Sequence, residues 1–312
     1  MLLGIEQHTA EALPLNIVID FLKKIHQNQQ MKDLICFSNN RFITLNEAGL
    51  PVTDLGVQRG YSIFDFLRIA NNIPLFLDEH LERFLSSAKE MRLPVNETKE
   101  KLKQIIAQLI IKNNLPDSGI RILLSGGTSP DGYQIVHPNL VIIQQPITPP
   151  SDKIFQKGYK LVSYPHQRQL PHVKTTDYVM AIWLQPWVIE READDVLYHQ
   201  NGIVSECPRS NFFIVTKEKK IITPGRNILK GITRKVILNL AVTNGMEVEE
   251  RDLSMEEIAH AKEAFITSST KRIIPVAKID DIIFEPCKQE DVTSQLFDLL
   301  LHKEKEIIAF HK

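Results

Sequence analysis

The chain has 312 residues, of which 43% are hydrophobic and 24% charged, so it is long enough for two domains and has the composition of a packed soluble protein. Its formal net charge of -1 argues against a general electrostatic attraction to nucleic acid or to a membrane surface. The three cysteines (Cys36, Cys207 and Cys287) are odd in number and widely spaced, which argues against a disulfide framework and a structural zinc site and favours a reducing compartment.

The N-terminal segment does not have the pattern of a targeting sequence. It has no basic start, and Glu6, Glu11 and Asp20 interrupt its apolar residues, so it is neither a signal peptide nor a transmembrane span. Two interpretations stay open for residues 1–30. They form an N-terminal extension with a short helix, or they are a mis-assigned start that precedes the true first residue, Met31. The sequence predicts a cytoplasmic protein.

Residues 31–147 are predicted to form a small α+β domain. Short β-rich runs indicate strands near 35–39, 41–46, 62–70 and 73–77. Helical spacing of apolar residues predicts helices over 78–91 and 99–112; in the first of them Leu81, Phe84 and Ala88 form the apolar stripe. Further strands are expected near 120–125 and 139–145.

A proline-rich polar stretch marks the domain boundary, with residues 148–153 as the linker. Residues 154–312 are predicted to form a larger C-terminal domain. Its strands are expected near 158–164, 195–200, 210–216, 247–252 and 264–269, and its helices after Lys174, over 232–244 and from 292 to the end. Strands and helices do not alternate strictly, so the pattern favours an α+β fold.

Common catalytic motifs are absent: the sequence has no G-x-G-x-x-G after a strand, no phosphate-binding G-x-x-x-x-G-K-[ST], no G-x-S-x-G and no H-E-x-x-H. The ten histidines do not cluster, so no metal site is expected. Four segments of the second half remain as candidates. They are QLPHVKTTDYVMA (169–181), NGIVSECPRSNFFIV (201–215), ILKGITRKVI (228–237) and FITSSTKRIIPV (265–276). Taken singly, each favours an ordinary role, such as a solvated lysine, a strand-edge glutamate, a helix start or a turn.

The order and spacing of these segments resemble the class IV aminotransferases, the fold-type IV family of pyridoxal-phosphate enzymes. DLGVQRGYSIFDFLR (54–68) and LDEHLERFLSSA (77–88) are similar to the N-terminal motifs of the same family, and the resemblance covers about residues 34–285. It implies two domains, each a sheet or barrel-like layer with packed helices, and a C-terminal domain that binds the cofactor. It also implies a homodimer whose active sites are completed across the subunits.

The resemblance assigns roles to individual residues. Lys174 matches the lysine that forms the Schiff base and moves the proton, and Glu206 matches the acidic partner of the pyridinium nitrogen. Tyr178 could hydrogen-bond the phenolic oxygen of the cofactor; a packing role is almost as well favoured. The phosphate is expected at the N-terminus of a helix, where unpaired backbone N–H groups favour an anion. The residues expected around it are Arg83, Ile232, Thr233, Ser268 and Ser269.

The substrate-binding residues depart from the family patterns. At the position where aminodeoxychorismate lyases carry a carboxylate-binding arginine, this chain has Asp131, and Asp65 follows Phe64 as the glutamate does in transaminases. D-Amino acid transaminases have an Arg-x-His pair that falls here on Asp131 and Tyr133. The candidate carboxylate-binding residues are instead three arginines: Arg59, which is expected to cross into the partner's site, Arg121 and Arg209.

The resemblance implies small-molecule amino acids and 2-keto acids as the substrates. A buried, unpaired Arg209 would conflict with an apolar pocket unless Asp131 or another acid pairs with it. We therefore expect a D-amino acid transaminase with a non-standard carboxylate trap, acting on D-alanine and D-glutamate with 2-oxoglutarate or pyruvate. A branched-chain L-amino acid aminotransferase is the alternative, and an aminodeoxychorismate lyase is a third. No nucleic acid or membrane partner is expected.

Overall fold

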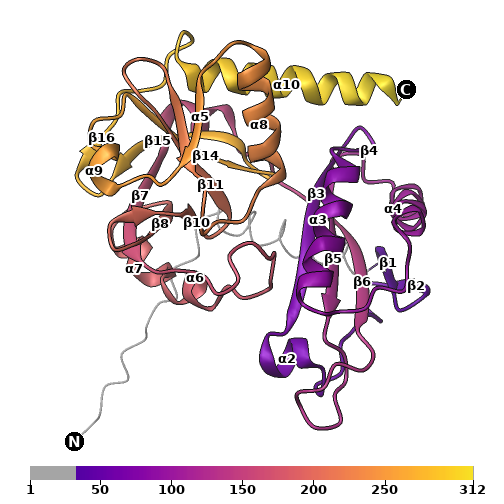
Figure 1. Cartoon of the computed structure of the whole chain (residues 1–312). Helices are drawn as coiled ribbons and strands as arrows, with labels where there is room; N and C mark the ends of the chain where they lie inside the picture. The colour runs from indigo at the N-terminus through magenta and orange to yellow at the C-terminus, as the bar shows by residue number, and fades with distance from the viewer. Residues whose placement is uncertain (1–32, 312) are drawn as a thin grey trace, which may run out of the picture.

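The computed structural model describes residues 33–311, and the two interpretations of residues 1–30 lie outside the described residues. The described chain forms two α+β domains that face each other across a central gap in the ribbon (Figure 1). The predicted α+β class with two domains is therefore confirmed.

The small domain is a six-stranded sheet with strand order β2-β1-β6-β5-β3-β4, and every neighbouring pair in it is antiparallel. Two amphipathic helices cover one face of this sheet, where their apolar stripes meet the strands in a single core. Its elements are β1 (Ile35–Ser38), β2 (Arg41–Thr44), α2 (Leu55–Arg59), β3 (Ser62–Ala70), β4 (Ile73–Pro74), α3 (Leu77–Glu90), α4 (Lys99–Asn113), β5 (Ser118–Ser125) and β6 (Asn139–Pro146).

Strand β3 is buried on both faces along its whole length. Because side chains alternate along a strand, Ile63, Leu67 and Ile69 enter the core beneath α3 and α4. Phe64 and Phe66 point the other way and line a cavity shared with the large domain. This one strand therefore forms both the core of the small domain and one wall of the site.

The large domain is built on a ten-stranded mixed sheet with the main order β13-β12-β11-β14-β15-β7-β8-β9. An antiparallel bridge between Ile203 and Ser254 brings the two ends of this path together, so the sheet is curled and barrel-like. Its elements are α5 (Asp152–Lys157), β7 (Tyr159–Pro165), α6 (Val179–Trp183), α7 (Gln185–Glu190), β8 (Asp195–Gln200), β9 (Ile203–Val204), β10 (Glu206–Cys207), β11 (Ser210–Val215), β12 (Ile221–Pro224), α8 (Ile232–Thr243), β13 (Val248–Arg251), α9 (Met255–Ile258), β14 (Glu263–Ser268), β15 (Arg272–Ile279), β16 (Ile282–Ile283) and α10 (Val292–Phe310).

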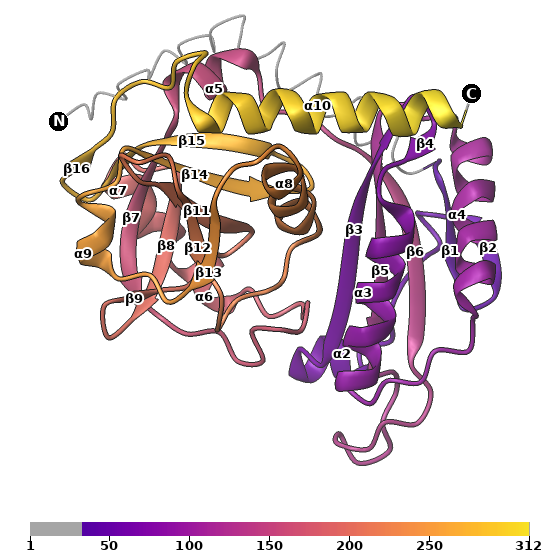
Figure 2. The same ribbon diagram turned by 45° about the horizontal axis from the view of Figure 1, so that its top comes forward.

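Two helices close the outer side of the large domain. Phe213 and Phe265 stack at 4.7 Å between ring centroids in the core beneath α8 and α10, whereas Phe212 and Ile214 point into the interior of the curled sheet. Helix α10 continues past the large domain and lies across both domains (Figure 2). None of the helices within residues 33–311 has both the length and the apolar character that crossing a membrane requires.

Three local predictions differ from the structure. The expected strand over 73–77 shrinks to the two residues of β4, because α3 begins at Leu77. The helix expected after Lys174 is divided into α6 and α7, with Pro186 in the first turn of α7. The last two residues of the proposed linker 148–153 already belong to α5.

Candidate active site

A cavity of about 650 Å³ lies between the two domains, of the size that ligand-binding sites have. The segments that line it come from β3, α3, β5 and the end of β6 in the small domain, from the crossover after β6, and from the large domain. It brings together eleven of the sequence-predicted site residues: Phe64, Arg83, Arg121, Lys174, Tyr178, Glu206, Arg209, Ile232, Thr233, Ser268 and Ser269.

Lys174 is held against the edge of β3. Its carbonyl oxygen accepts a 3.0 Å hydrogen bond from the N–H of Phe64, and Ile63 forms an antiparallel bridge with Thr175. The side chain is half-buried and reaches the cavity, with Nζ 4.6 Å from the centroid of the Phe64 ring. Burial, and then the nearby Arg83, lower the pKa of the Lys174 amine to about 7. A substantial fraction of this amine is therefore neutral, and nucleophilic, at neutral pH.

Glu206 is a buried carboxylate on β10 with three hydrogen-bond donors around it. Oε1 accepts from Arg168 at 3.0 Å, and Oε2 accepts from the backbone N–H of Leu229 at 3.0 Å and from Asn211 at 3.3 Å. Burial raises the pKa of Glu206 to about 7, although Arg168 and the Leu229 N–H act in the opposite direction. A cationic group in the cavity would therefore favour the ionised form of this carboxyl group.

Arg168, which also lines the cavity, was not predicted from the sequence. It lies in the loop before Lys174, where no motif marks it. Arg168 could have been identified by a physical argument. A buried glutamate needs a cationic or hydrogen-bonding partner. If Lys174 and Glu206 share one site, the loop before Lys174 has to pass close to Glu206. The guanidinium also donates a 3.2 Å hydrogen bond to the carbonyl oxygen of Val173, which ties the glutamate to the lysine segment.

Arg83 is held in place by an acid beneath it. Its Nε and Nη2 donate to the two carboxylate oxygens of Asp65, each at 2.8 Å, and His80 Nδ1 lies 2.7 Å from Asp65 Oδ1. Although burial opposes it, Arg83 and His80 lower the pKa of the Asp65 carboxyl group. The apolar stripe with Leu81 and Phe84 faces the core, as the helical spacing predicted, and Arg83 stands on the cavity side of α3.

The N-terminus of α8 opens on the same cavity. Gly231 precedes it, and a Cβ at this position would come within 2.2 Å of the amide oxygen of Asn211, so a larger residue would displace the Asn211 side chain from its hydrogen bonds to Glu206 and Leu229. Three buried polar atoms of lining residues have no hydrogen-bond partner within residues 33–311: Ser210 Oγ, Thr267 Oγ1 and Arg234 Nε. A helix N-terminus, unpaired donors and Arg83 on the walls of one cavity are groups suited to bind a phosphate group.

The arginines predicted to bind a carboxylate occupy different places. The Arg121 guanidinium lies 4.9 Å from the ring centroid of Phe64 and 5.6 Å from that of Phe66, and burial lowers its pKa. Arg209 lies on the turn between β10 and β11. Neither arginine pairs with an acidic side chain in the part of the chain that the structure describes.

One prediction about these arginines is wrong. Arg209 was expected to be a buried charge that conflicts with an apolar pocket, but it is exposed at the rim of the cavity, so little desolvation penalty applies. Asp131 does not pair with it. The Asp131 carboxylate instead closes its own loop by accepting hydrogen bonds from the backbone N–H groups of Tyr133 and Gln134, at 2.9 and 2.8 Å.

Arg59, Asp131 and Tyr133 do not reach the cavity of their own chain. All three are exposed, and the Arg59 guanidinium lies 5.6 Å from the centroid of the Tyr133 ring. They gather where α2 meets the loop between β5 and β6, at the end of the small domain farthest from α10 (Figure 1). The nearby Asp54 orders this corner, because its carboxylate accepts hydrogen bonds of 2.6 Å from Gly56 N–H and from Ser125 and Asn139.

Comparison with known proteins decides the family. The model of the family described as amino-transferase class IV matches residues 62–279, which is more than half of the chain. The chain belongs to the class IV aminotransferases. The D-alanine aminotransferase of Bacillus licheniformis is 29% identical over 247 residues, which cover 78% of this chain and 87% of that protein. A provisionally named branched-chain aminotransferase of Methanocaldococcus jannaschii is also 29% identical, over 83% of this chain and 93% of its own length.

Solved structures share the fold of this aminotransferase. A provisionally named 4-amino-4-deoxychorismate lyase of Legionella pneumophila superposes with a TM-score of 0.75 at 27% identity, covering 82% of this chain and 95% of its own. A branched-chain aminotransferase of Escherichia coli gives a TM-score of 0.80 at 24% identity, covering 87% and 94%. Another branched-chain aminotransferase with a TM-score of 0.80, at 22% identity, was solved with pyridoxamine 5'-phosphate. The family is pyridoxal-phosphate-dependent, so pyridoxal phosphate is the cofactor of this enzyme.

The residues of the cavity fit this cofactor. Its aldehyde requires a neutral amine, its ring nitrogen an anionic partner, and its phosphate a cation and free N–H or O–H donors. Lys174, Glu206 and Arg83 meet these requirements within one cavity, and Ser210 and Thr267 carry the unpaired hydroxyl groups. When bound, pyridoxal phosphate supplies the electron sink that allows a proton to leave the α-carbon of an amino acid.

Proposed function

We propose that this aminotransferase moves amino groups between D-amino acids and 2-keto acids, with D-alanine, D-glutamate, pyruvate and 2-oxoglutarate as its substrates. The observation that carries the proposal is the pair of lining arginines, Arg121 and Arg209, that have no acidic partner among residues 33–311. Similarity to the D-alanine aminotransferase of Bacillus licheniformis supports the choice of D-amino acids.

Each lining residue has a role in this proposal. Lys174 would hold the cofactor covalently and, once free, move the α-proton of the substrate; Glu206 would keep a proton on the ring nitrogen. Tyr178, whose pKa is raised by burial, would donate a hydrogen bond to the phenolic oxygen of the cofactor. The phosphate would be held by Arg83, Ile232, Thr233, Ser268 and Ser269.

Arg121 is the better placed of the two arginines for a carboxylate. Two aromatic rings fix its guanidinium plane at the wall of the cavity, so little side-chain entropy remains to be lost on binding. A planar guanidinium binds a carboxylate through two parallel hydrogen bonds. Arg209, at the rim, would then meet the second carboxylate of D-glutamate or 2-oxoglutarate.

A branched-chain L-amino acid aminotransferase is the second candidate. The exposure of Arg209 removes the desolvation argument against it, and apolar side chains of Phe64, Phe66, Ile182 and Leu229 line the cavity. The aminodeoxychorismate lyase stays a third candidate on similarity of fold and sequence. This chain lacks the carboxylate-binding arginine of the lyases, because Asp131 occupies that position and lies outside the cavity.

Half-reactions with separate substrates test the proposal. The enzyme loaded with pyridoxal phosphate is mixed with D-alanine, D-glutamate, L-leucine or aminodeoxychorismate, and the absorbance of the enzyme-bound cofactor is followed. We expect D-alanine and D-glutamate to discharge the absorbance band, with pyruvate and 2-oxoglutarate as products. A discharge by L-leucine alone would support the branched-chain candidate, and pyruvate release from aminodeoxychorismate would support the lyase.

The same half-reactions with Arg121→Met test the carboxylate site. Loss of a charged hydrogen-bonding partner should raise the substrate concentration needed for half-maximal discharge by roughly tenfold to a hundredfold. Arg226→Met is the matched control, because Arg226 is an exposed arginine paired with Asp252 and does not line the cavity. An unchanged concentration dependence in Arg121→Met would remove Arg121 from the binding site.

We infer further that two copies of the chain complete each other's sites. Arg59 and Tyr133 lie on an exposed corner away from the cavity of their own chain. The large domain exposes apolar side chains on α6, where Val179 is 71%, Ile182 69% and Trp183 65% exposed, and Ile182 also lines the cavity. Adjacent exposed apolar side chains are typical of a protein–protein interface.

Heterodimers test whether Arg59 acts across the interface. Chains carrying Lys174→Ala and Arg59→Ala, with different affinity tags, are expressed together and the mixed dimer is isolated. One of its two sites combines an intact Lys174 with an intact Arg59 from the other chain, so we expect about half of the wild-type activity, well above that of either homodimer. No recovery in the mixed dimer would place Arg59 in the site of its own chain, and full activity of the Arg59→Ala homodimer would remove it from the site.

A further inference from the structure

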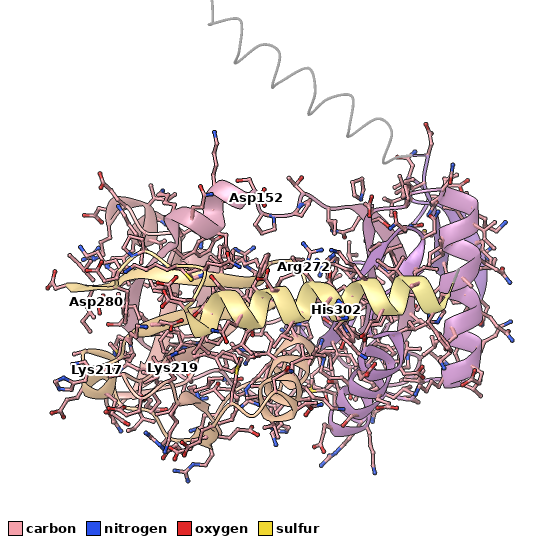
Figure 3. All side chains as sticks on the ribbon, turned by 90° about the horizontal axis from the view of Figure 1, so that it is seen from above. Asp152, Lys217, Lys219, Arg272, Asp280 and His302 are labelled. Carbon is pink, nitrogen blue, oxygen red and sulfur yellow. The ribbon has the colours of Figure 1, made fainter. Side chains whose placement is uncertain are left out.

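The C-terminal helix joins the two domains through one buried carboxylate. Glu304, on α10, is only 5% exposed and lies between an arginine of the small domain and an arginine of the large domain. Helix α10 spans both domains, with Arg272 beside it (Figure 3). A buried acid in this place is costly unless it is fully paired, so its partners are informative.

Both arginines bind the same carboxylate group through several hydrogen bonds. Arg68 donates from Nη1 to Oε1 at 2.9 Å and from Nη2 to Oε2 at 3.2 Å. Arg272 donates from Nε to Oε2 at 2.9 Å and from Nη2 to Oε2 at 2.8 Å, and its Nε also lies 3.2 Å from Oε1. The two partners belong to elements that are distant in sequence, so Glu304 connects β3 with β15.

Each of these arginines lies within a few residues, along the chain, of residues that line the cofactor cavity. Arg68 lies on β3, two residues beyond Phe66 and on the same face of the strand as Phe64 and Phe66. Arg272 is the first residue of β15 and follows the turn of residues 268–271, of which residues 268–270 line the cavity on the opposite side.

The backbone of Arg272 is also strained. Its φ of 59° lies in the left-handed region, which a residue other than glycine or asparagine seldom adopts and which persists only where the surrounding structure holds it. The turn before it is closed by a 3.2 Å hydrogen bond from the N–H of Lys271 to Ser268 Oγ. The ion pair with Glu304 is the contact that holds the Arg272 side chain while the backbone makes this turn.

We propose that Glu304 is a positioning residue for the cofactor site: by binding Arg68 and Arg272 together, it fixes the turn of residues 268–270 at a set distance from β3. It touches neither cofactor nor substrate. It acts through the two arginines on the opposite walls of the cavity. The phosphate donors of the large domain thereby stay at the distance from Arg83 of the small domain that cofactor binding requires. The proposal depends on the cofactor site and not on which amino acid the enzyme uses.

The affinity of the apo-protein for pyridoxal phosphate tests this role without any measurement of activity. Tryptophan fluorescence is followed as the cofactor is added, in parallel with thermal unfolding of each apo-protein. We expect the dissociation constant of pyridoxal phosphate to rise about tenfold or more in Glu304→Gln and in Arg272→Gln. Glu306→Gln is the matched control, because Glu306 lies on the same helix and, within residues 33–311, pairs only with its near neighbours His302 and Lys303. The affinity of this variant should equal that of the wild type.

A double variant separates positioning from stability. Arg68→Met with Glu304→Leu replaces the buried ion pair by apolar side chains of similar volume, a change that buried pairs often tolerate, but it leaves Arg272 without its partner. We expect this variant to unfold near the wild-type temperature and yet to bind pyridoxal phosphate about tenfold more weakly. Wild-type affinity in the double variant or in Arg272→Gln would overturn the proposal, even if Glu304→Gln does not fold.

Discussion

Replacing Lys174 with alanine is expected to prevent covalent attachment of pyridoxal phosphate and to lower turnover by at least about 10³-fold. Lys174 is the one lysine among the residues that line the cavity within residues 33–311. Its pKa, lowered to about 7 by burial and by Arg83, makes the neutral amine available as a nucleophile and as a base at neutral pH. Alanine has no amine, so it can act neither as the nucleophile nor as the base.

Borohydride reduction followed by peptide mass spectrometry measures the attachment directly. The wild-type enzyme should carry the reduced cofactor on the peptide that contains Lys174, and Lys174→Ala should carry it nowhere. Lys230→Ala is the matched control, since this exposed lysine stands just before Gly231 but does not line the cavity. Full turnover by Lys174→Ala would show that another group performs the chemistry.

Much of the fold could be predicted because it follows from local patterns. The helical spacing of Leu81, Phe84 and Ala88 defines which face of α3 is buried, and the alternation along β3 separates the core side chains from Phe64 and Phe66. Tertiary contacts decided the remainder. Strand β15 was not predicted, because the same residues read equally well as a turn followed by a short apolar run until β14 and β7 pair with it.

The site was predictable only in part. Order and spacing led to Lys174, Glu206 and the start of α8, which the fold brings into one cavity. Arg168 was missed because its role depends on the loop passing beside Glu206, which no local pattern records. The burial of Arg209 was misjudged for the same reason: whether a turn residue faces the interior or the rim depends on the packing of the neighbouring elements.

The titratable groups of the cavity act on one another. Burial moves the pKa of Lys174 and of Glu206 toward neutrality from opposite sides, and each charge favours the ionised form of the other. Arg168 and Arg83 add positive charge from two sides, and Asp65 compensates Arg83. An anionic phosphate would pair with the unpaired donors of Ser210, Thr267 and Arg234, and a protonated ring nitrogen would pair with Glu206.

Substitution of Glu206 by glutamine is expected to lower kcat by about 10²- to 10³-fold while the cofactor stays bound. The amide keeps the shape of the side chain, but it has no negative charge to hold a proton on the ring nitrogen. It also leaves Arg168, 3.0 Å away in the native protein, as an uncompensated cation that disfavours a protonated ring. Without that proton the cofactor withdraws electrons less strongly from the substrate, so the loss falls mainly on kcat and not on KM.

Steady-state kinetics together with the absorbance spectrum of the bound cofactor measure this effect. Glu263→Gln is the matched control: Glu263 is a buried carboxylate of β14 that accepts hydrogen bonds from the backbone N–H groups of Val292 and Thr293 at the start of α10, away from the cavity. We expect this control to lower thermal stability and to leave kcat near the wild-type value. A kcat near the wild-type value in Glu206→Gln would instead show that the ring nitrogen reacts without its proton, and that Glu206 serves only to hold Arg168 and the segment before Lys174.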